Sequence, residues 1–96
     1  MDRTAALNLA LRAARDSMPP LRLAIIRDLA EHRDSTTGDV RKRLQKPRNT
    51  VDRQLQALHM LGVLQCEEEP DPRRPGYTIW RYSATDGVDL TALDPE

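Results

Sequence analysis

The sequence predicts a mainly α-helical fold with a small β-hairpin, an α+β protein, and three observations lead to that prediction. Apolar residues recur at helical spacing in successive stretches of the first two thirds of the chain. The stretch 46–64, KPRNTVDRQLQALHMLGVL, joins a basic turn, an amphipathic helix, a glycine and an apolar run. Two short runs suited to strands then flank a loop that contains three prolines.

The length and composition of the chain indicate one small domain. A chain of 96 residues can bury a single modest core, and with no Phe and 3% aromatic residues that core should be aliphatic. Cys66 is the only cysteine, which excludes an intramolecular disulfide and a cysteine metal cluster. Neither a long apolar run nor a signal-peptide pattern is present, so we expect a cytoplasmic protein that makes no membrane contact.

The first predicted helix covers residues 3–17, which are rich in Ala, Leu and Arg and contain neither Gly nor Pro. It should end near Met18, because residues before proline avoid the α region and Pro19 follows. Its apolar stripe comprises Leu7, Leu11, Ala14 and Met18. Residues 1–18 either pack on their own domain or pair with a second copy of the chain, and the sequence leaves both alternatives open.

Two further helices follow in the next part of the chain. Residues 20–33 carry an apolar face, and residues 37–45 follow a short break at 34–37. Thr36 and Asp39 have the spacing of a capping box at the start of the second of these helices. The buried face of 20–33 comprises Leu21, Ala24, Ile25, Asp28 and Leu29, and its solvated face comprises Arg27, Glu31 and Arg33. Helix 37–45 should bury Val40 and Leu44 and expose Arg41, Lys42 and Arg43.

The fourth helix is expected at about 48–61. A turn precedes it, because Pro47 prevents the third helix from continuing. Asn49 is the better N-cap by residue type, although Arg48 could also open the helix. Gly62 is placed to end the helix in the left-handed conformation, with Val63 packing back on Leu58. The expected buried stripe is Val51, Leu55, Leu58 and Leu61. Helices 37–45 and 48–61, joined by a tight turn, form a helix-turn-helix unit.

After Gly62, the sequence predicts two strands around a loop. VLQCEEE alternates, with Leu64 and Cys66 on one side; the loop is 70–76, and YTIWRYS at 77–83 returns as the second strand. In the second strand we expect Trp80 and Tyr82 to face inward, with Ile79 and Arg81 outward. Residues 85–96 contain four acids and no base, and we expect them to form an acidic tail.

Charge is concentrated although the net charge is zero. Between residues 41 and 53, six basic residues stand against one acid, Asp52, which gives this segment a charge of +5. Such a segment beside a helix-turn-helix favours binding to phosphates. The acids that balance it lie at residues 67–71 and in the C-terminal stretch.

The chain resembles the winged helix-turn-helix superfamily. The pattern T-V-x-x-x-L-x-x-L-x-x-x-G-hydrophobic-hydrophobic marks the family's recognition helix and its exit into the wing, and it is matched by Thr50, Val51, Leu55, Leu58, Gly62, Val63 and Leu64. The resemblance covers about residues 20–84 and divides the chain into an N-terminal helix (1–18), a winged domain (19–84) and the tail (85–96). Family members include bacterial repressors and domains of replication or mobile-element proteins.

This resemblance implies binding of double-stranded DNA through a recognition helix, about 48–61, and a wing, about 70–76. The implied DNA-binding residues are Arg41, Lys42, Lys46, Arg48, Asn49, Thr50, Asp52, Arg53, Gln54, Gln56, Arg73 and Arg74. Thr50 would contact a phosphate and Gln56 would flank the backbone. Arg53 would pair with guanine and Gln54 with adenine. Arg73 and Arg74 would touch the minor groove or backbone.

Asp52 is the departure from a DNA-reading surface, because a carboxylate repels phosphate. It could accept from a cytosine amino group, or it could hold Arg48 or Arg53 in place. We expect first that it stabilises the helix N-terminus as an acid of the early turns.

Other chemistry finds little support in the sequence. His32, His59 and Cys66 make no recognisable zinc-ligand spacing, and no phosphate-binding glycine loop or nucleophile–base set is present, so we expect neither an enzyme nor a cofactor. Binding of single strands by stacking is disfavoured, because Tyr77, Trp80 and Tyr82 are expected to serve the core. The expected function is transcription regulation. The alternative is a DNA-binding or protein-interaction module of a replication or mobile-element protein, whose N-terminal helix or acidic tail contacts a partner. A homodimer through the N-terminal helix is compatible with either.

Overall fold

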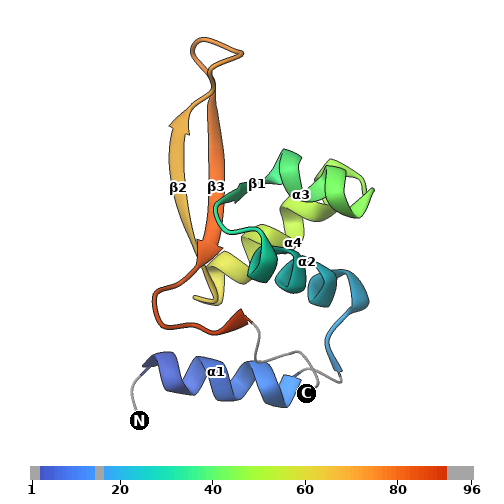
Figure 1. Ribbon diagram of the computed structural model, residues 1–96, viewed down its shortest axis with the longest axis vertical. Coiled ribbons are helices and arrows are strands. Elements are labelled where there is room, and N and C mark those ends of the chain that lie inside the picture. Colours follow the sequence, from blue (N-terminus) through green and yellow to red (C-terminus); the bar gives the residue numbers. More distant parts are fainter. Residues whose placement is uncertain (1–2, 15–16, 91–96) are drawn as a thin grey trace.

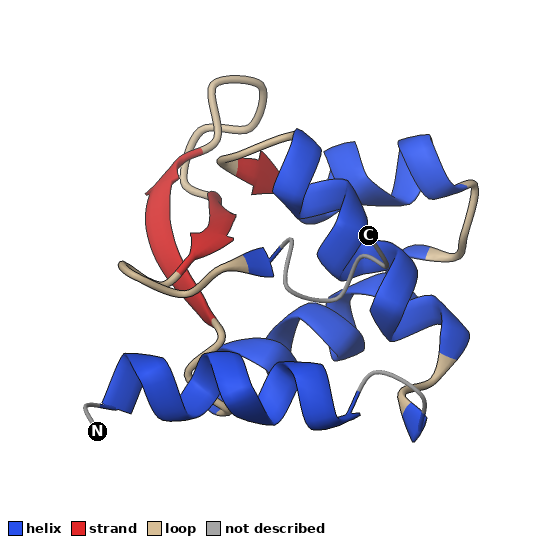
Figure 2. Cartoon of the chain, turned by 60° about the horizontal axis from the view of Figure 1, so that its bottom comes forward, coloured by secondary structure: helices blue, strands red, loops and turns tan. Residues whose placement is uncertain are grey.

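The computed structural model describes residues 3–14 and 17–90 (Figure 1). Its elements are α1 (Arg3–Ala14), α2 (Pro20–Glu31), β1 (Ser35–Thr36), α3 (Thr37–Leu44), α4 (Arg48–Met60), β2 (Leu64–Pro70) and β3 (Thr78–Ala84). The predicted α+β fold is confirmed. Helices α2, α3 and α4 form a cluster beside the sheet, the β2–β3 hairpin projects past them, and α1 lies at the opposite end from the hairpin loop (Figures 1 and 2). No helix in the described ranges is long and apolar enough to cross a bilayer.

The exit from α4 follows the prediction made from Gly62. Gly62 has φ +85°, its amide donates to His59 O at 3.0 Å, and the amide of Val63 donates to Leu58 O at 3.1 Å. These two bonds form a Schellman motif, which turns the chain so that Val63 and Leu64 enter the core. The prediction that Leu61 completes the buried stripe is wrong, because this residue is 58% exposed. It is the C-cap residue, beyond the last helical turn, where the reversal of the chain carries its side chain to the surface.

The predicted start of α3 is confirmed, and the predicted start of α4 is corrected. The capping box of α3 is present, with Thr36 Oγ1 accepting from the amide of Asp39 and the Asp39 carboxylate accepting from the amide of Thr36, each at 3.1 Å. Asn49 is not the N-cap of α4. That helix starts at Arg48 after Pro47, which has ψ 139° and whose carbonyl accepts from the amide of Val51 at 3.1 Å. The fixed φ of proline therefore defines the start without a side-chain cap.

The sheet has three antiparallel strands in the order β1-β3-β2. β1 was not predicted, because two residues are too few to show an alternating pattern, and the stretch 34–37 was expected to be a break. Ser35 pairs with Tyr82, and Cys66 pairs with Tyr82 from the other side. Tyr82 is thus flanked by strands on both sides, as is Arg81, and Tyr82 is 4% exposed.

Trp80 is a second correction. It lies two residues before Tyr82 and so on the same face of β3, but it is 47% exposed. Ile79 and Arg81, which we expected outward, are half-buried and therefore less exposed than Trp80, so the predicted burial of this strand holds only at Tyr82. The outer half of the hairpin runs past the helices (Figure 1), which leaves Trp80 without a covering element. On the other face, Arg81 is half-buried and donates to Glu69 Oε1 at 2.6 Å and to Asp34 O at 2.9 Å.

The segment after β3 returns to α1. Val88 and Leu90 are buried, 8% and 5% exposed, in the same core cluster as Leu11. Asn8 joins the two segments, since its Nδ2 donates to Gly87 O at 3.2 Å and its Oδ1 accepts from the amide of Asp89 at 2.8 Å. Residues 85–90 are thus packed on the domain and differ from the tail that we expected, while 91–96 lie outside the described residues.

The N-terminal helix also packs on its own domain, one of the two alternatives that the sequence left open. Leu11 is 5% exposed, whereas Leu9 is 50% exposed. The helix is described over Arg3–Ala14, and residues 15 and 16 of the predicted span lie outside the described residues.

Candidate nucleic-acid interface

The open face of α4 is set by the residues that the helix buries. Val51, Leu55 and Leu58 are at most 1% exposed, so the opposite side of the helix faces solvent. That side carries Asn49, Thr50, Arg53 and Gln56, all exposed. Arg48, the first residue of α4, is exposed as well and lines the groove beside the wing. The structure thus brings four of the predicted α4 site residues onto one surface, with Arg48 at the start of the helix.

The basic residues of α3 and the turn extend this surface. Arg41, Lys42 and Lys46 are exposed, like Arg48 and Arg53. Among the residues that the structure describes, none of these five cations is in an ion pair. We call them the basic face. Their charge is available to an anion, because no carboxylate of the described chain neutralises it at short range.

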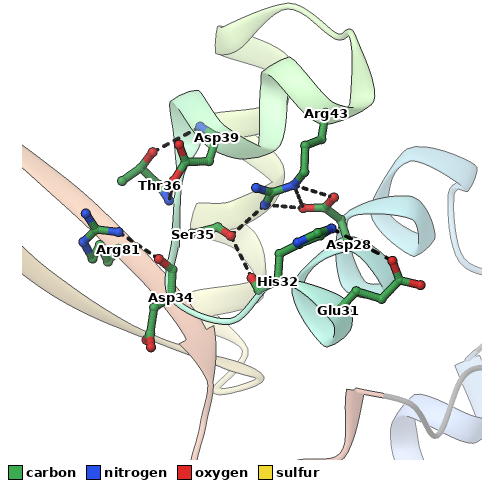
Figure 3. Close-up of polar contacts among 9 residues, drawn as sticks. All are labelled: Asp28, Glu31, His32, Asp34, Ser35, Thr36, Asp39, Arg43 and Arg81. Carbon is green, nitrogen blue, oxygen red and sulfur yellow. Dashed lines mark hydrogen bonds and ion pairs between the residues drawn. The ribbon is translucent and has the colours of Figure 1, made fainter.

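Arg43 is different, although the sequence groups it with Arg41 and Lys42 (Figure 3). Its Nε lies 2.9 Å from Asp28 Oδ1, and its Nη2 lies 2.7 Å from Asp28 Oδ2 and 2.6 Å from Ser35 Oγ. Ser35 Oγ in turn donates to His32 O at 2.7 Å. The hydrogen bonds to Asp28 raise the pKa of Arg43 above its ordinary value. Arg43 therefore fixes α3 against α2 and β1, and the basic face has one cation fewer than the sequence predicts.

Asp52 also has a structural partner that the sequence did not reveal. Its Oδ1 accepts from Thr37 Oγ1 at 3.2 Å, and its Oδ2 accepts from Gln56 Nε2 at 2.9 Å. The expected helix-terminus role is wrong, because the first turn of α4 contains no acid. The carboxylate instead joins the middle of α4 to the first residue of α3. It thereby holds the two helices of the helix-turn-helix at a fixed spacing.

Gln54 faces away from the open surface. It is half-buried, and its Oε1 accepts from Arg22 Nε of α2 at 2.8 Å. Helical spacing places Gln54 at the edge of the buried stripe, three residues after Val51 and four before Leu58. Its partner Arg22 lies 32 residues away, and the sequence pattern does not reveal that contact. Gln54 therefore lies apart from the other predicted reading residues.

The wing loop carries the remaining predicted cations. Asp71 N donates to Tyr77 O at 2.9 Å and closes the loop, while the Asp71 carboxylate accepts from the amide of Arg73 at 2.9 Å. Arg73 and Arg74 are exposed, and the Arg74 guanidinium lies 5.2 Å from the centre of the Tyr77 ring. The loop thus presents two arginines on a closed turn.

A groove of about 630 Å³ separates the wing from the starts of α3 and α4. The residues that line it are Thr36, Thr37, Gly38, Asp39, Lys42, Arg48, Asp71, Pro72, Arg73, Arg74, Tyr77, Thr78, Ile79, Trp80 and Arg81. Two of them, Tyr77 and Trp80, are exposed aromatic residues that we had expected in the core. Only the length of the hairpin relative to the helices places them here, and that length relation is not visible in the sequence.

Comparison with solved structures bears on the fold. The PcaV transcriptional regulator from Streptomyces coelicolor in complex with its natural ligand superposes with TM-score 0.59 at 18% identity, over 79% of this chain and 50% of that one. A MarR family transcription regulator gives TM-score 0.62 at 20% identity, over 93% of this chain and 59% of that one. The chain has the winged helix-turn-helix fold.

A third neighbour is the Staphylococcus aureus MarR in complex with salicylate and kanamycin, with TM-score 0.58 at 17% identity over 92% of this chain and 56% of that one. The winged helix-turn-helix chain described here thus spans between 50% and 59% of the length of these regulators. No family model matches its sequence, and neither does any curated protein.

Proposed function

We propose that this winged helix-turn-helix chain binds double-stranded DNA and regulates transcription. The basic face is the observation that carries the proposal: Arg41, Lys42, Lys46, Arg48 and Arg53 are all exposed and outside every ion pair of the described residues. Five exposed cations on adjoining helices of a helix-turn-helix can each neutralise a phosphate of a duplex and gain affinity by releasing counterions. The fold, shared with regulators, favours the role in transcription.

In this proposal α4 lies in the major groove and the wing follows the neighbouring minor groove. Arg53 reads guanine, and Arg48, Asn49 and Thr50 bind phosphates beside the helix start. Asp52 and Gln54 contribute through the helices they join rather than through bases, because both already have partners. Arg73 and Arg74 contact the minor groove from the wing tip.

Fluorescence anisotropy with labelled duplex DNA at several salt concentrations tests this proposal. Arg48→Ala should weaken binding and flatten the log–log salt slope by about 0.9, the value for one lost phosphate contact. Arg53→Ala should cost about 1–3 kcal/mol on a selected site and much less on random sequence. Arg12→Ala is the matched control, because Arg12 is exposed on α1, at the opposite end from the wing. Equal affinities for all four proteins would overturn the proposal.

Selection of binding sites from random duplex DNA separates sequence reading from general affinity for duplexes. Enrichment of one motif, lost in Arg53→Ala, supports a regulator, whereas no enrichment contradicts it. The alternative role in a replication or mobile-element protein gains no support from the structural neighbours, which are described as transcription regulators.

We also propose that two copies associate through α1, because Leu9 is 50% exposed on the side of that helix away from buried Leu11. Deleting the helix would confound the test by removing Leu11 from the core. Leu9→Glu changes only the outer side. Light scattering should give a dimer for the parent chain and a monomer for Leu9→Glu; a monomer in both cases excludes the proposal.

A further inference from the structure

The groove beside the wing contains an aromatic surface that duplex binding does not use. Trp80 is 47% exposed and Tyr77 is 63% exposed, although both are large apolar side chains. Tyr82, on the same face of β3 as Trp80, is 4% exposed and stacks edge-on with His59. The premise that disfavoured base stacking, that all three aromatic residues serve the core, holds only for Tyr82.

The groove is also strongly cationic. Five cationic side chains and two carboxylates line it. Both carboxylates have partners within the chain: Asp39 belongs to the capping box, and Asp71 accepts from the amide of Arg73. Of the cations, Arg81 is paired with Glu69, which leaves Lys42, Arg48, Arg73 and Arg74 without a carboxylate partner among the described residues. An aromatic side chain between such cations suits a ligand with a flat ring and a phosphate.

The edge of the sheet keeps this groove open. β1 pairs with β3 only at Tyr82 and Arg81. Beyond that pair, residues 78–80 of β3 are bonded to β2 alone, and their other edge faces the start of α3 across the groove. Trp80 therefore lies beyond the end of β1, at a position where neither a strand nor a helix covers that edge of β3.

We infer that this groove binds an unpaired nucleotide adjoining the duplex, with its base stacked on Trp80 and its phosphates beside Lys42 and Arg48. The inference rests on the proposed duplex binding and names a preferred substrate class: duplex DNA with a single-stranded overhang, fork or bulge. Bases inside a duplex stack on one another and cannot offer a face to the indole, so only an unpaired base meets the geometry. Stacking tolerates any base, so this contact adds affinity without adding sequence preference.

Trp80 is the only tryptophan of the chain, and its fluorescence reports on its own contact. Three DNAs are compared: a blunt duplex, the same duplex with a short overhang, and that overhang without bases. The overhang should bind more tightly than the blunt duplex and quench Trp80. The abasic overhang carries the same phosphates, so it should lose the quenching and most of the added affinity. Quenching as strong with the abasic DNA overturns the inference.

Substitutions assign the effect to the indole. Trp80→Ala should remove the preference for the overhang, a loss of between about 5-fold and about 140-fold in affinity for that DNA, whereas Trp80→Phe should keep part of it. Met60→Ala is the matched control, because Met60 is 86% exposed and does not line the groove. Circular dichroism checks that the exposed sites tolerate substitution.

The blunt duplex separates this inference from the proposed function. Trp80→Ala should bind it as tightly as the parent chain, and Arg53→Ala should bind it less well. If the parent chain binds the blunt duplex but shows no preference for the overhang, stacking is refuted while duplex binding stands. If it binds the overhang through Trp80 but not the blunt duplex, the proposed function fails and the groove remains a single-strand site. If Trp80 responds to no DNA, the groove is not a nucleotide site and its aromatic surface suits a protein partner instead.

Discussion

We expect Arg43→Ala to destabilise the fold more than Asp28→Ala, although the two substitutions break the same ion pair. The Asp28 side chain is 6% exposed and that of Arg43 is 31% exposed. Arg43→Ala leaves a buried carboxylate without its cation. Asp28→Ala leaves a guanidinium that still donates to Ser35 at 2.6 Å and can turn its other donors toward water.

The magnitudes follow from that asymmetry. Removing one partner of a fully buried pair costs about 3–5 kcal/mol, and exposed pairs contribute about 1 kcal/mol or less. Arg43→Ala, which strands the more buried group, should therefore cost about 3 kcal/mol. Asp28→Ala should cost about 2 kcal/mol, between the two limits.

Urea unfolding followed by circular dichroism gives the free energy of unfolding for each variant. The matched control is Arg41→Ala on the same helix, because Arg41 is exposed and in no ion pair of the described residues. It should change stability by less than about 0.5 kcal/mol and yet weaken DNA binding. Arg43→Ala should lower the free energy of unfolding, whereas the molecules that remain folded should bind DNA as tightly as the parent chain. Equal losses for Arg43→Ala and Asp28→Ala, or a larger loss for Asp28→Ala, would refute the reasoning.

Two further predictions concern local devices. The amide of Thr36 donates to the Asp39 carboxylate and holds its pKa below the ordinary 3.8, so this stabilisation is present above pH 3.8 and is lost as the pH falls through the lowered pKa. Asp39→Asn should cost about 0.5–1 kcal/mol at neutral pH, and urea midpoints should converge with those of the parent chain in acid; a constant difference contradicts the assignment. Gly62→Ala should cost about 1 kcal/mol because Gly62 has φ +85°. Its control, Gly38→Ala, should raise the thermal midpoint, since a Cβ there meets Thr36 Oγ1 at an ordinary 3.7 Å; a fall of similar size in both would contradict the argument.

The sequence by itself determined the features that depend on near neighbours. The buried stripe of Val51, Leu55 and Leu58 follows from helical spacing. The capping box of α3 needs only two residues three positions apart. Gly62 ends α4 because its left-handed backbone is strained for most other residues. Pro72 and Pro75 mark the wing loop, whereas Pro70, which we expected in the loop, ends β2, an edge strand in which a proline is tolerated. Each of these is settled within about two helical turns of chain, so the one-dimensional pattern was sufficient.

Only the tertiary structure decided which surface residues are available to a ligand. Arg41 and Arg43 look alike in the sequence, but Asp28, 15 residues away, removes Arg43 from the basic face. Arg22 does the same to Gln54 across 32 residues, and Trp80 is exposed because the hairpin is longer than the core it covers. The fold was therefore readable from short-range periodicity, whereas the site was not. Residues distant in sequence form ion pairs and hydrogen bonds with these side chains, so groups that look available from the composition are already paired.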